Sequence, residues 1–228
     1  MAEETQPRGV LGEIEPRGVV LMAQAPRPGT VRRALEPMLG AERCAALQTT
    51  LIRRAAAWGE RVAPGNLHVA CEPPGAGPEL RALLGPRTSI VPQNGVGISG
   101  QIADATGRLF AHGEGPVLII WPDLLNWRPE HVDGALADLR DGCGVSFGPM
   151  FDGGFYLIAL ARPLPVLFAL AEDAWRSPDA TMLAITAAHG AGLEAGVLRA
   201  ERGLHQPADV RAALADPLTE PGIRALLK

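Results

Sequence analysis

The chain alternates between two kinds of hydrophobic pattern. Short, nearly continuous apolar runs bounded by Gly, Pro or charged residues are typical of strands that are buried on both faces of a sheet. Longer segments with apolar residues three or four positions apart are typical of helices with one buried face. The two kinds follow one another along the whole sequence, which predicts an α/β fold with a mainly parallel sheet and helices on both of its faces.

Apolar runs at seven places predict strands. We expect the first, Gly18–Ala23, to be central in the sheet. The others are Asn66–Cys71, Thr88–Val91, a run from Val117 that ends at Asp123, a run from Val145 that leads to Asp152, Phe155–Leu160 and Val197–Ala200.

Helical spacing is strongest in Glu42–Arg61, where the apolar residues share one side. The other predicted helices are Pro78–Leu84, Gly97–His112, Pro129–Arg140, Leu164–Trp175, Asp179–His189 and Ala208–Ala215.

The length of 228 residues suits one α/β domain, and no Pro/Ser-rich linker divides the sequence. We expect a flexible tail over residues 1–16 and a single domain over residues 17–228, built as a three-layer sandwich.

Composition narrows the function. The formal net charge of -4 comes without a basic stripe, which argues against nucleic-acid binding. No apolar run approaches the ~20 residues that span a membrane, and no signal peptide is visible. Cys44, Cys71 and Cys143 lack metal-ligand or disulfide spacing, so we expect a cytoplasmic protein in a reducing compartment.

Two carboxylates follow predicted strands. Asp123 ends the run from Val117, and Asp152 begins an Asp-Gly-Gly turn after the run from Val145. Ligands of open α/β sheets bind outside the carboxyl ends of the strands, so both side chains are expected near a ligand. Asp152 also has a purely structural interpretation, because Asp-Gly pairs form turns.

The loop Gln24–Arg33 follows the first strand and carries three arginines. Guanidinium groups there would suit phosphates, although by itself the local pattern favours an ordinary solvated loop. The sequence has no Gly-x-Gly-x-x-Gly after the first strand, no Walker motif and no Gly-x-Ser-x-Gly elbow, so it supports neither a dinucleotide fold nor those two chemistries.

Three motifs together resemble a known superfamily. They are Ala-Pro-x-Pro-Gly at 25–29, the strand that ends at Asp123, and Gly-Pro-x-x-Asp-Gly-Gly-Phe-Tyr-Leu-Ile at 148–158. Over roughly Val19 to Ala215 the chain looks like the GT-A-type nucleotide-diphospho-sugar transferases. It is most similar to small bacterial glycosyltransferase-like proteins, and it also resembles guanylyltransferases that activate 2-phospholactate or the molybdenum cofactor.

The resemblance implies a nucleotide held on the first loop and a divalent cation, Mg²⁺ or Mn²⁺, bridged to its phosphates. Asp123 is the candidate metal ligand, with His205 as a second ligand or merely a helix-entry residue before Pro207. Asp152 is the candidate catalytic residue at the acceptor. The candidate nucleotide-binding residues are Ala23, Gln24, Ala25, Pro26, Gly29, Arg32, Arg33, Gly100 and Asp123.

The chain also departs from the family pattern. Gln24 and Ala34 stand where such proteins carry Lys and Arg, and Trp121-Pro122 stands in place of Gly-Ser. Leu125-Asn126 replaces Pro-Asp, and Gly203-Leu204-His205 replaces a late Asp-Val-Asp.

These observations leave three functions open. The first is metal-assisted glycosyl transfer from a nucleotide sugar to a small-molecule acceptor. The second is nucleotidyl transfer of the guanylyltransferase kind. The third, favoured by the lost motif residues, is a non-catalytic nucleotide- or partner-binding protein. The resemblance is compatible with a homodimer but does not decide the oligomeric state.

Overall fold

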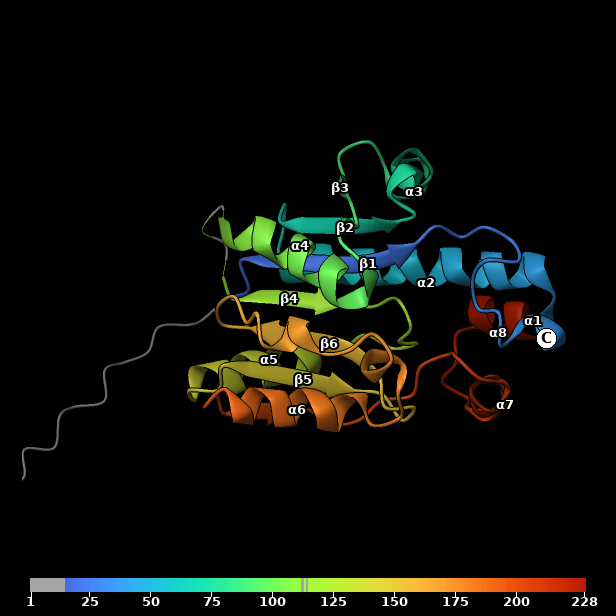
Figure 1. Ribbon diagram of the computed structural model, residues 1–228. Coiled ribbons are helices and arrows are strands. Elements are labelled where there is room, and N and C mark those ends of the chain that lie inside the picture. The colour runs from blue at the N-terminus through green and yellow to red at the C-terminus, as the bar shows by residue number, and fades with distance from the viewer. Residues whose placement is uncertain (1–14, 112, 114) are drawn as a thin grey trace, which may run out of the picture.

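The computed structural model describes residues 15–111, 113 and 115–228, and Figure 1 shows how its elements are arranged. Most of the tail predicted over residues 1–16 therefore lies outside the described residues, as does His112 at the end of one predicted helix.

The described residues form a seven-stranded sheet in the order β3-β2-β1-β4-β6-β5-β7. Strand β1 pairs in parallel with β2 and β4, whereas β6 is antiparallel to both β4 and β5. The sheet is thus mainly parallel, as predicted, and β1 lies inside it next to the middle strand β4. The strands are β1 Gly18–Gln24, β2 Leu67–Glu72, β3 Ser89–Pro92, β4 Val117–Ile120, β5 Val145–Pro149, β6 Phe155–Leu160 and β7 Ala195–Val197.

Helices cover both faces of the sheet, which confirms the three-layer α/β architecture (Figure 1). Alternate residues of β1 point to opposite faces, so Leu21 packs against α2 while Met22 joins the core under α4. The helices are α1 Glu36–Leu39, α2 Ala41–Val62, α3 Gly77–Leu84, α4 Gly97–Ala111, α5 Pro129–Arg140, α6 Ala180–Gly190, α7 Pro207–Ala215 and α8 Pro221–Leu227, with a short 3₁₀ helix η1 at Pro74–Ala76.

Besides the two apolar clusters on the faces of the sheet, a third lies beyond its carboxyl edge. The first half of α2 extends past the strands, and its residues Leu47 and Leu51 pack against α1, α7 and α8. Leu204, in the segment that precedes α7, is fully buried in this cluster. The cluster therefore anchors the chain next to His205.

The predicted helix Leu164–Trp175 is wrong. Two 3₁₀ helices, η2 Leu167–Ala169 and η3 Ala174–Arg176, flank an extended Leu170. The Leu170 carbonyl accepts a hydrogen bond from the Ser99 hydroxyl at 2.9 Å, and Glu172 accepts one from the Ile98 N–H at 2.7 Å. These contacts with the start of α4 replace the helical hydrogen bonds.

The last strand lies two residues earlier than the predicted Val197–Ala200. It pairs in parallel with β5 from Ala195 to Val197. Gly196 in its middle lies against Asp138, and an added Cβ would come within 2.1 Å of that carboxylate. The strand requires glycine there, and an apolar pattern does not mark glycine as a strand residue.

Candidate functional site

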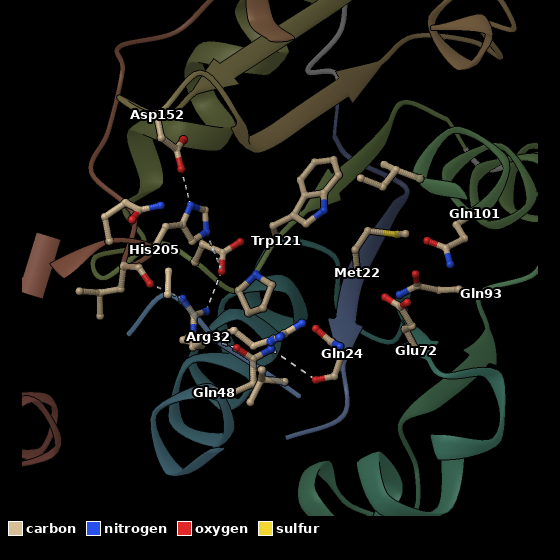
Figure 2. A pocket seen from close by; sticks show the side chains of 18 of the residues that line it. Met22, Gln24, Arg32, Gln48, Glu72, Gln93, Gln101, Trp121, Asp152 and His205 are labelled. Carbon is tan, nitrogen blue, oxygen red and sulfur yellow. Dashed lines mark hydrogen bonds and ion pairs between the residues drawn. The ribbon is translucent and has the colours of Figure 1, made fainter. Parts of the chain in front are cut away.

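A cavity of about 800 Å³ opens at the carboxyl ends of β1, β2 and β4. Side chains reach it from β1, the following loop, α2, α4, the loop after β4 and the segment before α7 (Figure 2). Its size is typical of a small-molecule site, and its place is the one expected for ligands of open α/β sheets.

An alternating chain of charges crosses one end of the cavity. The guanidinium of Arg32 contacts Oδ1 of Asp123 at 2.6 Å, and Nε2 of His205 lies 3.2 Å from the same oxygen. Nδ1 of His205 faces Oδ2 of Asp152 (Figure 2). The order is therefore cation, carboxylate, imidazole, carboxylate.

Arg32 is held by three acceptors. Its Nε donates to Oε1 of Gln48 at 2.9 Å, and a terminal nitrogen donates to the Leu204 carbonyl at 2.5 Å, besides the contact with Asp123. Its φ of 51° makes it a non-glycine residue in the left-handed region. Such a conformation costs about 1–3 kcal/mol and persists where surrounding contacts impose it.

His205 reaches Asp123 because its segment is attached to the end of β4. The Leu204 N–H donates to the Asp123 carbonyl at 3.1 Å, and Leu124 forms an antiparallel bridge with Gly203. Since Leu204 is also fully buried, the imidazole is fixed relative to the sheet.

Asp152 is oriented by the turn in which it lies. Its Oδ1 accepts a hydrogen bond from the Gly154 N–H at 3.1 Å, and Gly153 adopts a φ of 92°. The Gly153 carbonyl accepts hydrogen bonds from both the N–H and the hydroxyl of Thr181 in the first turn of α6. The turn is thus attached to the start of that helix.

The chain of charges shifts all three titratable groups in it. Burial lowers the pKa of His205, but Asp123 and Asp152 outweigh it and raise that pKa to about 10. Burial raises the pKa of Asp123, but the charges of His205 and Arg32 outweigh it and hold that pKa well below its usual range. The hydrogen bond from His205 lowers the pKa of Asp152. At neutral pH the site therefore has an imidazolium between two carboxylates.

The three arginines of the first loop have different environments. Arg32 belongs to the chain of charges, and Arg27 pairs with Glu79 outside the cavity. Arg33 lines the cavity and is exposed, and within the described part of the protein its side chain has no hydrogen-bond or ion-pair partner. Arg33 is therefore a cation available to a ligand.

The structure brings six of the predicted site residues to this cavity: Gln24, Arg32, Arg33, Asp123, Asp152 and His205. Ala23 and Ala25 are instead buried in the core. Neither Pro26 nor Gly29 lines the cavity, and Gly100 packs its backbone against Gly95.

Sequence reasoning missed Glu72, Gln93 and Gln101, which also line the cavity. Glu72 and Gln93 follow predicted strands closely, which is the signal that singled out Asp123. Gln101 comes from one face of α4, and no sequence pattern distinguishes that face from the rest of the helix.

The donor set does not fit the divalent cation that the resemblance implies. Both imidazole nitrogens of His205 face carboxylates, and Oδ1 of Asp123 is contacted by both Arg32 and His205. Across the described residues, no three His, Cys, Asp or Glu side chains are grouped to hold a metal ion. The metal roles of Asp123 and His205 stay predictions that this arrangement does not support.

No helix in the described ranges is long and apolar enough to cross a bilayer.

Comparison with known proteins gives a family and a fold. The model of the family described as "Uncharacterized protein conserved in bacteria (DUF2064)" matches residues 55–175. A protein of Desulfovibrio desulfuricans G20, provisionally described as a nucleotide-diphospho-sugar transferase, has a similar structure with a TM-score of 0.81 and 23% sequence identity. The match covers 94% of each chain.

Two more distant structures share the fold. Rv0371c of Mycobacterium tuberculosis H37Rv has a TM-score of 0.54 at 18% identity, over 89% of this chain and 100% of that one. A 4-diphosphocytidyl-2C-methyl-D-erythritol synthase has a TM-score of 0.53 at 11% identity, over 95% of this chain and 100% of that one. No curated protein matches by sequence. The fold is that of the nucleotide-diphospho-sugar transferases, as the motifs indicated.

Proposed function

The chain belongs to this DUF2064 family of bacterial proteins, and we propose that it is a transferase that binds a nucleotide-activated donor in the cavity and passes the donor's group to a small-molecule acceptor. One observation carries the proposal. A row of charged side chains, Arg32–Asp123–His205–Asp152, lies at the carboxyl ends of the strands, and Arg33 lines the same cavity. Cations for phosphate and a carboxylate for an acceptor thus share one cavity.

In this proposal the donor is a nucleoside-diphospho sugar. Arg33, whose side chain has no hydrogen-bond or ion-pair partner in the described structure, binds the diphosphate and stabilises the charge that gathers on the leaving group. The similarity of fold to the Desulfovibrio protein supports a sugar donor by analogy.

Asp152 is the proposed base. Its side chain is 38% exposed, so an acceptor hydroxyl can approach it. The acceptor oxygen forms a bond to the anomeric carbon while the bond between that carbon and the phosphate oxygen breaks. The bonding electrons leave with the nucleoside diphosphate, and the hydroxyl proton passes to Asp152.

The first test is binding of nucleoside diphosphates by calorimetric titration, comparing wild type with Arg33→Ala. We expect the variant to bind at least tenfold more weakly, because a charge-assisted contact contributes roughly 1.5–3 kcal/mol. Stability should change little, since the Arg33 side chain has no hydrogen bond or ion pair to lose in the described structure. Arg211→Ala, an exposed position on α7 outside the cavity, is the matched control.

If wild type binds no nucleoside diphosphate, or if both variants bind like wild type, the proposal is wrong. Product analysis then separates the two transferase classes. Release of nucleoside diphosphate from a nucleotide sugar identifies glycosyl transfer, whereas release of pyrophosphate from a nucleoside triphosphate identifies nucleotidyl transfer. Binding without turnover of either would leave a binding protein.

A further inference from the structure

The other end of the cavity is lined by polar side chains that the proposed chemistry does not use. Gln24 pairs in register with Glu72 on β2. Cys71 pairs with Pro92 on β3, so Glu72 and Gln93 are the next residues on neighbouring parallel strands. These three residues form a row at the carboxyl edge of the sheet.

The row faces the helix α4. On β2, Ala70 packs into the core under this helix, and Glu72 lies two residues further on, which puts it on the same face. Gln93 lies two residues after Val91, which also packs under α4, so Gln93 is on that face as well. Gln101 comes from α4 itself, and Figure 2 shows the ends of Glu72, Gln93 and Gln101 gathered beyond Met22.

The polar groups of these side chains make few hydrogen bonds within the described protein. Gln93 is buried, and its Nε2 donates to the Ala70 carbonyl at 2.7 Å, which fixes the orientation of the amide. Within the described part of the chain, neither the Glu72 carboxylate nor the Gln101 amide has a side-chain hydrogen-bond partner. The cleft thus offers a free carboxylate, which only accepts hydrogen bonds when ionised, next to amides that can also donate.

We propose that this row is a base-recognition site and that Glu72 selects guanine. The proposal rests on the proposed function, because it assumes that a nucleotide occupies the cavity with its phosphates toward Arg33. The guanine edge presents N1–H and the 2-amino group side by side, and the two oxygens of a carboxylate accept both hydrogen bonds at once. The guanine O6 next to them suits an amide N–H such as that of Gln101.

The other bases match the carboxylate less well. Adenine and cytosine each place a ring nitrogen acceptor beside their amino group, so one carboxylate oxygen would face a lone pair. Uracil places its single N–H between two carbonyl oxygens. Two acceptors that face each other in a partly buried cavity weaken binding. Specificity therefore comes both from the hydrogen bonds made to guanine and from those that the other bases cannot make.

The experiment measures the affinity of GDP, IDP, ADP, CDP and UDP for wild type and Glu72→Gln by calorimetric titration. We expect wild type to bind GDP at least tenfold more tightly than ADP, CDP or UDP. IDP, which differs from GDP only by the missing 2-amino group, should bind about tenfold more weakly than GDP. Glu72→Gln should lose most of the preference for GDP, because GDP binding weakens while the amide N–H, which can donate to a ring nitrogen, removes the mismatch with ADP and CDP.

Glu194→Gln is the matched control, because it neutralises an exposed carboxylate outside the cavity. The inference is overturned if another diphosphate binds as tightly as GDP. It is also overturned if Glu72→Gln weakens all five equally, since Glu72 would then not read the base. If no diphosphate binds wild type, the proposed function fails and the base site fails with it. If diphosphates bind without a preference for guanine, only the base site fails.

Discussion

Every charged side chain of the cluster at one end of the cavity has an opposite charge beside it. Asp123 lies between Arg32 and His205, and His205 lies between two carboxylates. Partly buried charges are tolerated when they are paired in this way, because each offsets the desolvation of the next. Substituting one member of the cluster should therefore shift the pKa values of the others and lower the stability of the protein.

His205 gives a prediction for the pH dependence of stability. Its pKa is about 10 in the folded protein and near 6.5 when unperturbed, so the folded state binds the proton more tightly. This contribution is fully present below about pH 6.5 and is lost as the pH rises through about 10. Between these values, the free energy of unfolding of wild type should fall more steeply with pH than that of His205→Gln, as measured by urea titration.

Parallel curves for the two proteins would show that His205 does not carry this coupling. Titration of Asp123 and Asp152 does not contribute to the slope in this pH range, because their pKa values are lowered. Their contributions are present above the unfolded value of 3.8 and are lost only in acid.

At the scale of elements, tight turns aim the functional groups. The turn after β5 points Asp152 at His205, and it requires Gly153 for two reasons. Its φ of 92° is unfavourable for side chains, and an added Cβ would lie 2.0 Å from the Pro178 carbonyl. The neighbouring Gly154 has neither restriction, because an added Cβ there would meet nothing closer than 3.4 Å.

This difference predicts unequal effects of two adjacent substitutions. Gly153→Ala should lower the free energy of unfolding by about 1–3 kcal/mol and displace Asp152, because backbone must move to make room. Gly154→Ala should cost clearly less. Chemical denaturation of both variants measures the effect, and equal losses would mean that the turn tolerates Gly153→Ala by moving as a unit.

At the scale of the whole molecule, the cavity is assembled from distant parts of the chain. Its cations come from the loop after β1 and from the segment before α7, and its carboxylates come from the ends of β2, β4 and β5 and from Glu172. Arg32 and His205 are paired with Asp123 and Asp152, and Arg33 brings an unpaired positive charge to the cavity for which the sequence resemblance implies a divalent metal. This charge is supplied by the fold itself.

We therefore expect nucleoside diphosphate binding to survive removal of metal ions. Titrations with EDTA and with added Mg²⁺ or Mn²⁺ should give dissociation constants within about threefold of each other, which is under 1 kcal/mol. Binding that disappears with EDTA and returns with Mn²⁺ would reinstate the metal roles of Asp123 and His205.

The hydrophobic pattern by itself determined most of the fold. Buried strands and one-faced helices differ in period, so the positions of β1, β4, β6 and α2 follow from the sequence alone. The pattern failed over Leu164–Trp175, where apolar residues at helical spacing are held by contacts with α4 instead of by a helix. Local pattern cannot show that a distant element will take the hydrogen bonds.

The site divides in the same way. The sequence indicated Asp123 and Asp152, because a polar residue after a buried strand must lie at the edge of the sheet. The resemblance already grouped His205 with them. Only the tertiary structure decided that its ring lies between the two carboxylates, that Arg33 is free while Arg27 is paired, and that Glu72 and Gln93 lie side by side. Those relations depend on strand order and on how loops pack, and neither is encoded in the spacing of residues along the chain.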